Sequence, residues 1–180
     1  MKDLSMHIMD ILQNSTRAKA KNITLEVLED ILADTLTLVF KDDGCGMSEE
    51  MVRNVVNPFF TTRTTRKVGL GLPLLKQNAE MTGGSVEIRS KEGEGTLVTA
   101  VFGLSHIDRP PMGDLPGTLV LTIAAHPEIH FVFHFGRSNS DNDTDYVLDT
   151  DELYEALDGV SLQEPEVMAY IKEMVAENIR

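Results

Sequence analysis

Several features that would mark other classes of protein are scarce in this sequence. Its 180 residues include a single cysteine, which excludes an internal disulfide framework. No apolar run approaches the roughly 20 residues that span a bilayer. The first 20 residues carry Asp3, His7, Asp10 and Arg17, so they contain no signal-peptide core. The sequence therefore predicts a soluble, cytoplasmic protein with no membrane insertion, built as one domain or as one domain with an extension.

Positive charge is also scarce. The chain has 16 Lys and Arg against 29 Asp and Glu, a net charge of −13. Nonspecific binding to nucleic acid needs a basic face, so we expect no nucleic-acid partner. The imbalance is concentrated in residues 104–180, which hold four basic and 15 acidic side chains. This acidic segment is either an interaction surface or a set of solvated helices.

Residues 4–20 predict an amphipathic helix with a polar stripe. The apolar face recurs at helical spacing and consists of Leu4, Ile8, Ile11, Leu12 and Ser15. The polar stripe consists of His7, Asp10, Asn14 and Arg17. An amide oxygen such as that of Asn14 can complete an Mg²⁺ shell that also holds phosphate oxygens. A carboxylate one turn away, at Asp10, can orient or deprotonate a nucleophile. Taken alone, the stripe also fits an ordinary surface helix.

A second motif, Asp42-Asp43-Gly44-Cys45-Gly46-Met47, follows a predicted strand over residues 35–41. Gly44 and Gly46 permit backbone angles closed to other residues and let a ligand approach closely. Asp42, at the end of the strand, can accept a hydrogen bond from an adenine amino group. An ordinary Asp-Gly turn would have the same composition.

A third motif, Val68-Gly69-Leu70-Gly71-Leu72, enters a predicted helix over residues 71–82. Free backbone amides and the positive end of a helix dipole form an anion site. Three cationic residues, Arg63, Arg66 and Lys67, lie just upstream. A flexible glycine loop is the alternative for this motif alone, but the three motifs in this order indicate one site.

Together the motifs resemble the N, G1 and G2 boxes of the GHKL superfamily, which includes gyrase B, a heat-shock chaperone, histidine kinases and mismatch-repair MutL. Residues 57–63, Asn-Pro-Phe-Phe-Thr-Thr-Arg, resemble the F box of histidine kinases, and Asn14-Ser15-Thr16-Arg17 resembles their Asn-Ala-x-Lys. Gly93-Glu94-Gly95-Thr96 resembles the late strand in which a threonine supports adenine binding. The resemblance covers about residues 4–103 and is closest to the ATP-binding domains of histidine kinases and of small anti-sigma serine kinases.

This resemblance implies the Bergerat ATP-binding fold, an α+β two-layer sandwich in which helices cover one face of a mixed β-sheet. The implied cofactors are ATP and Mg²⁺. Asn14 would hold the metal, Asp42 would read adenine, Asp10 would be the catalytic base, and residues 48–68 would form a lid. The whole implied ATP-binding set is Asn14, Arg17, Asp42, Gly44, Gly46, Thr61, Thr62, Arg63, Lys67, Gly69, Leu70, Gly71, Leu72 and Thr96.

Two positions depart from the family pattern, and a third, His7, bears on the question of a phosphoacceptor. Lys67 stands where many histidine kinases have the first glycine of Gly-x-Gly-x-Gly. Asp10 replaces the usual glutamate and is one methylene shorter, which weakens the expectation of hydrolysis more than that of ATP binding. His7 is too close to Asp10 to be a separate phosphoacceptor, and we expect it to be a surface residue or a partner of Asp10.

Residues 1–103 are predicted to form the ATP-binding domain, and residues 104–180 an acidic extension. In the extension, residues 118–124 and 129–135 alternate like two strands, and we expect a β-hairpin over 118–135 that completes the sheet. Two helices are predicted to follow, over 149–157 and 164–178. Two interpretations are open for His126, His130 and His134. They could form a metal site, but we expect them instead to be half-buried neighbours on one strand and its turn.

Two main functions agree with these residues. The first is a stand-alone, histidine-kinase-like protein kinase that transfers the γ-phosphate to a phosphoacceptor on a partner protein in signalling or regulation. The second is a non-kinase switch or slow ATPase, in which nucleotide closes the lid and changes the affinity for a regulated partner. A detached nucleotide-binding half of a sensor system is a third possibility.

Overall fold

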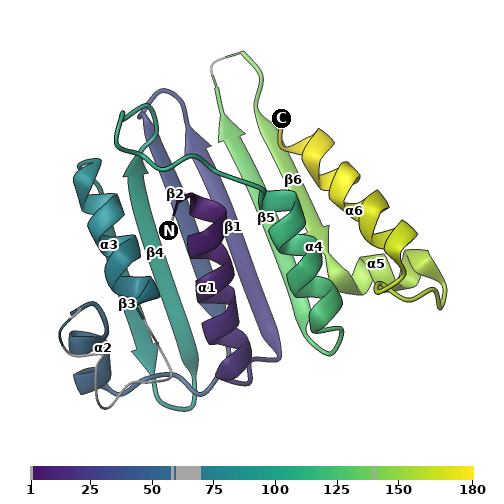
Figure 1. The fold of residues 1–180 in the computed structure, drawn as a ribbon, viewed down its shortest axis with the longest axis horizontal. Coiled ribbons are helices and arrows are strands. Elements are labelled where there is room, and N and C mark those ends of the chain that lie inside the picture. The colour runs from purple at the N-terminus through teal and green to yellow at the C-terminus, as the bar shows by residue number, and fades with distance from the viewer. Residues whose placement is uncertain (1, 58, 60–69, 140) are drawn as a thin grey trace.

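The computed structural model describes residues 2–57, 59, 70–139 and 141–180, and its centre is a six-stranded mixed sheet (Figure 1). The strands are β1 (Asn22–Asp30), β2 (Thr35–Asp42), β3 (Ser85–Lys91), β4 (Gly95–Gly103), β5 (His130–Ser138) and β6 (Thr144–Asp149). Their order across the sheet is β3-β4-β2-β1-β5-β6. Neighbouring strands are antiparallel except for β1 and β5, which are parallel.

Helices lie on one face of this sheet (Figure 1). They are α1 (Leu4–Arg17), α2 (Glu49–Val55), α3 (Gly71–Met81), α4 (Leu115–Ala125), α5 (Thr150–Leu157) and α6 (Pro165–Asn178). Helix α1 lies between α3 and α4 and contacts both, and α6 packs against α4. The predicted fold class, an α+β two-layer sandwich with helices on one face of a mixed sheet, is confirmed.

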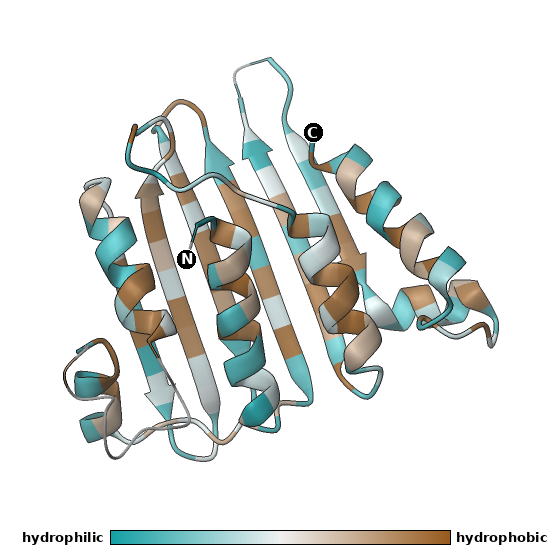
Figure 2. Cartoon of the chain, viewed as in Figure 1, coloured by the Kyte–Doolittle hydropathy of each residue, from teal (hydrophilic) through white to brown (hydrophobic). Residues whose placement is uncertain are grey.

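Alternating side chains of the strands form the core beneath the helices. In β1, β2 and β5 every second residue is buried, and Figure 2 shows the resulting alternation of hydrophobic and hydrophilic bands along the strands. The largest fully buried side chains of the core include Phe102, Phe131, Phe133, Leu4, Ile8, Leu12 and Leu25. The apolar face predicted for α1 is buried at each of its five positions. Apolar residues recur every second position in the strands and about every 3.6 positions in α1. These periods determine which face of the sheet and which face of α1 pack together.

The first half of the hairpin predicted over residues 118–135 is wrong, because residues 115–125 form the helix α4. An Asp114 side-chain oxygen accepts the Gly117 amide and caps this helix, and Pro116 occupies its first turn, where no amide is needed. Helix α4 is apolar nearly all round because it packs against α1, α6 and the sheet. A short apolar run of this kind has no periodicity that separates a strand from a helix.

The second half of that prediction is confirmed, because residues 130–138 form β5 and join the sheet beside β1. Phe131, Phe133 and Phe135 point into the core, as the alternation predicts. Parallel pairing requires a crossover, which α4 supplies between β4 and β5. The two terminal helices are also confirmed within a residue at each end.

The sheet is continuous across residue 103, since β5 and β6 extend the same sheet as β1 to β4. The division of the chain into two domains at that residue stays a prediction. None of the helices in the described ranges has both the length and the apolar character needed to cross a bilayer.

Candidate nucleotide-binding site

Helix α1 places Asp10 and Asn14 one turn apart on its side facing α3. The helix begins after Asp3, whose side chain accepts the Met6 amide at 2.8 Å. Asp10 Oδ2 and both amide atoms of Asn14 are buried, yet they have no hydrogen-bond partner among the residues described. Buried polar atoms are nearly always paired, so this group of atoms has the character of an incomplete binding site.

The start of α3 lies directly against Asp10. A Cβ atom added at Gly71 would fall 1.6 Å from Asp10 Oδ2, so only glycine permits this close approach. Burial raises the pKa of Asp10, and the charge of Arg17 in the last turn of α1 opposes that rise. With its pKa raised, the Asp10 carboxylate is a stronger base than that of an exposed aspartate and accepts a proton more readily.

Among the described residues, no side chain caps the first turn of α3, so its leading amides are unsatisfied by the helix itself. This turn includes Leu70, Gly71 and Leu72. Leu70 is exposed, whereas the Leu72 side chain is buried in the core, which leaves only its backbone for contact with a ligand. The anion site predicted at this helix end stays a prediction, and the uncapped amides are the groups that would form it.

The turn after β2 presents Asp42 at the edge of the site, with both carboxylate oxygens engaged. Ser15 Oγ donates to Asp42 Oδ2 at 2.7 Å, and the Gly44 amide donates to Asp42 Oδ1 at 2.9 Å. The sequence predicts Ser15 on the apolar face of α1, and only the structure shows its hydroxyl bound to Asp42. The clue was a serine on that face directly after Asn14.

The same turn is fixed to its neighbours through the backbone. The Cys45 amide donates to the Ala18 carbonyl at 2.9 Å, and its carbonyl accepts from the Gly93 amide at 2.8 Å. Gly46 has a φ of 68°, and a Cβ there would lie 2.0 Å from the Lys91 carbonyl oxygen, so glycine is required. These contacts hold the turn against α1 and the β3–β4 connection without a ligand.

Thr96 lies opposite Asp42 in the register of β4 and β2. Its hydroxyl is hydrogen-bonded to Ser90 Oγ at 2.8 Å, and Ser90 Oγ also accepts from the Met47 amide at 2.8 Å. The structure therefore places Thr96 beside Asp42, as the sequence predicts. Ser90 was missed because no sequence motif marks it.

Five residues predicted to contact ATP lie outside the described residues: Thr61, Thr62, Arg63, Lys67 and Gly69. The same holds for most of the predicted lid after Asn57. Their roles stay predictions.

His7 is not the surface residue or Asp10 partner that the polar stripe suggested. It is fully buried, and its Nε2 contacts Asn78 Nδ2 of α3 at 2.7 Å. Burial lowers the pKa of His7 to about 4. The stripe misled because the edge of α1 that carries His7 is covered by α3. His7 consequently ties α1 to α3 next to the site.

The comparisons with known proteins match this geometry. The profile of the histidine kinase-, DNA gyrase B- and HSP90-like ATPase family matches residues 2–106, more than half of the chain. The chain belongs to this family. The matched segment contains α1, the turn after β2, the start of α3 and β4, which together build the site described above.

Relatives of this family member include sensor kinases. The chain is 27% identical to the sensor histidine kinase YvrG of Bacillus subtilis over 97 residues, covering 52% of this chain and 17% of the relative. It is 27% identical to sporulation kinase C of the same organism over 101 residues, covering 56% of this chain and 23% of the relative. The chain thus spans less than a quarter of the length of these relatives.

A solved structure shares the fold over nearly the whole chain. The Aquifex aeolicus MutL ATPase domain, complexed with ADP, is similar with a TM-score of 0.50 and 13% identity, over 97% of this chain and 70% of that one. This likeness supports the fold, and at such identity it says nothing further about activity.

Proposed function

We propose that the protein binds Mg-ATP between α1, the turn after β2 and the start of α3, and transfers the γ-phosphate to a partner protein. The observation that carries the proposal is the set of buried atoms, Asp10 Oδ2 and the Asn14 amide, that have no partner among the described residues and lie on the same helix as Asp10's contact with the start of α3. An anionic ligand with its cation would satisfy all of these groups together.

The adenine end of the site is formed by Asp42. Its oxygens are oriented by Ser15 and by the Gly44 amide, and each oxygen keeps a second lone pair for a ligand. A carboxylate accepts only from a donor, which selects the amino group of adenine over the carbonyl of guanine. Thr96, across the strand pair, lies where it can assist this contact.

The phosphate end is formed by α3 and α1. The uncapped leading amides of α3 would donate to a phosphate, and Arg17 adds positive charge. The Asn14 amide oxygen is an oxygen donor of the kind that Mg²⁺ prefers, so this residue fits the metal beside the phosphates. Bound there, Mg²⁺ would neutralise charge on the phosphates.

Asp10 is the group placed for proton transfer. Its raised pKa brings it closer to the operating pH of a general base. Asp10 also lines an open groove of about 330 Å³ between α1 and α4, together with Met6, Met9, Gln13 and Thr118. A hydroxyl or imidazole of a partner protein could approach Asp10 along this groove.

An ATP-dependent switch is the second candidate, favoured by one specific set of contacts. Asp43, next to Asp42, binds Asn22, and Asn22 binds His130 of β5. A change at the nucleotide turn is thus connected directly to the acidic C-terminal segment.

Incubation with γ-labelled ATP and an extract of the source organism separates these candidates. A labelled partner protein seen with the wild type and lost in both Asp10→Asn and Asn14→Ala supports the kinase. Label released only as free phosphate supports the slow ATPase or switch. Failure of the wild type to bind Mg-ATP at all would contradict both.

A further inference from the structure

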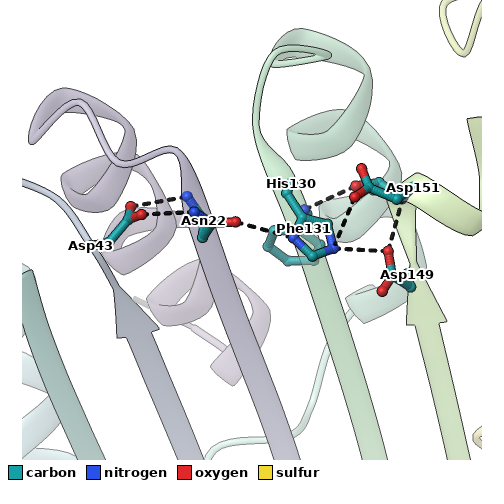
Figure 3. Close-up of polar contacts among 7 residues, drawn as sticks. Asn22, Asp43, His130, Phe131, Asp149 and Asp151 are labelled. Atoms are coloured by element: carbon teal, nitrogen blue, oxygen red, sulfur yellow. Dashed lines mark hydrogen bonds and ion pairs between the residues drawn. The ribbon is translucent and has the colours of Figure 1, made fainter.

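A second group of ligating side chains lies at the far end of the sheet, outside the nucleotide site. His130 begins β5, Asp149 ends β6, and Asp151 lies in the first turn of α5. One ligand atom from each residue lies within 4.8 Å of the others. His130 Nε2 is 2.9 Å from Asp149 Oδ1 and 3.7 Å from Asp151 Oδ2 (Figure 3).

The other ring nitrogen of His130 decides what its Nε2 atom can do. Asn22 Nδ2 donates to Asp43 Oδ2 at 2.7 Å, so the amide oxygen of Asn22 faces His130, and its Oδ1 lies 3.1 Å from Nδ1 (Figure 3). Nδ1 must therefore carry the hydrogen. In the neutral ring, Nε2 then presents a lone pair to two carboxylates.

A metal ion between these three atoms would take the place of the proton that otherwise joins Nε2 to Asp149 Oδ1 at 2.9 Å. An imidazole whose second nitrogen is hydrogen-bonded to an oxygen is the usual arrangement of a metal-ligating histidine. We propose that His130, Asp149 and Asp151 bind a divalent transition-metal ion of the Zn²⁺ class, with water completing the shell. The imidazole ligand favours such an ion over Mg²⁺, which prefers oxygen alone.

The ligands are held in place by contacts outside the proposed shell. Thr150 Oγ1 accepts the Phe131 amide at 2.9 Å, which fixes the start of α5 against β5. Asp149 Oδ1 accepts the Asp151 amide at 2.9 Å and caps α5. The Asp151 side chain is 71% exposed, which leaves one side of the site open for water and for exchange of the ion.

His134 provides an internal comparison in the same strand. It also contacts two carboxylates, but they lie at opposite ring nitrogens: Asp145 at Nε2 and Glu26 at Nδ1. Among the described residues, neither ring nitrogen of His134 faces both carboxylates, so this histidine offers no shared position for a metal ion. His134→Ala is therefore a matched control that removes a histidine from this strand and leaves the proposed site intact.

The test is titration of the untagged, nucleotide-free chain with Zn²⁺ by calorimetry and with Co²⁺ by absorption. One ion per chain should bind, with a tetrahedral Co²⁺ spectrum, and millimolar Mg²⁺ should not compete. His130→Ala and Asp151→Asn should each remove this binding. Asn22→Ala should weaken it about 10-fold, as loss of an outer-shell partner does. His134→Ala and Asn14→Ala should bind like the wild type.

Because Asp149 also caps α5, its substitution should be Asp149→Ser, which keeps a capping oxygen and removes the carboxylate. Nitrogen NMR of the His130 ring gives a second readout, since Nε2 should shift when Zn²⁺ is added. A ring protonated at both nitrogens near neutral pH that ignores millimolar Zn²⁺ would overturn the proposal, and so would equal uptake by His130→Ala.

Discussion

The two ends of the candidate nucleotide site differ in how far the protein satisfies its own polar groups. At the adenine end, both oxygens of Asp42 accept hydrogen bonds, and the turn is fixed by backbone contacts. At the phosphate end, Asp10 Oδ2 and the Asn14 amide are buried without a partner among the described residues. One end is thus built in advance, whereas the other is completed by what binds there.

The largest effect should come from the unsatisfied end. Asp10→Asn should lower phosphotransfer by about 10²- to 10⁴-fold, because an amide cannot accept the proton of the nucleophile. Binding of Mg-ATP, measured by calorimetry, should stay close to that of the wild type. If Asp10→Asn still transfers phosphate at the wild-type rate, Asp10 has a structural role only. The proposed division into a preformed adenine end and a catalytic phosphate end would then be wrong.

At the preformed end, substitution should weaken nucleotide binding itself. Asp42→Asn should weaken the binding of both ATP and ADP by roughly 1.5–3 kcal/mol, because a charged acceptor is replaced by a neutral amide that can also donate. Ser15→Ala removes one of the two bonds that orient Asp42 and should cost about 1 kcal/mol. A larger loss for ATP than for ADP in Asp42→Asn would contradict a role confined to adenine.

The link between α1 and α3 should be sensitive to acid. The pKa of His7 falls from 6.5 to about 4 on folding, so the unfolded chain binds a proton in that interval that the folded chain does not. Stability is therefore complete above pH 6.5 and is lost as the pH falls toward 4, by about 2–3 kcal/mol. In His7→Leu this part of the pH slope should vanish.

Urea unfolding at several pH values measures that slope. His106→Leu, at an exposed histidine, is the control and should keep the wild-type slope. The same slope in His7→Leu would mean that the acid sensitivity arises elsewhere.

A smaller effect should show how closely α3 approaches Asp10. Gly71→Ala places a methyl group against Asp10 Oδ2 and should destabilise the fold by about 1–2 kcal/mol. In an Asp10→Ala background the same change should cost much less, which gives a coupling energy in a double-mutant cycle. Additive effects of the two substitutions would show that the helices do not meet at this point.

Much of the fold follows from local pattern. Three local patterns each fit one kind of element, and the structure has that element in each place. They are the amphipathic period of α1, the alternation in β1 and β2, and the glycine turn after Asp42. Helix α4 does not follow from pattern, because a short run that is apolar on all sides satisfies either a buried strand or a buried helix. Only the packing of α1 and α6 on its two sides settles the matter.

The site was predictable where residues adjoin in sequence and not where they meet through the sheet. Asp10 and Asn14 share a helix face, so their spacing reveals them. Ser90 reaches the site because β3 pairs with β4, and Asp149 meets His130 because β6 pairs with β5. Such long-range pairing leaves no local signal in the sequence.

The most direct test of the account is the stability of the folded chain in the presence of Mg-ATP. At 100 times the dissociation constant, Mg-ATP should raise the free energy of unfolding of the wild type by about 2.7 kcal/mol. Asn14→Ala and Asp42→Asn should show little of this gain at the same concentration. A wild type whose stability does not change at millimolar Mg-ATP would contradict the central claim that the unpartnered groups of α1 await a nucleotide.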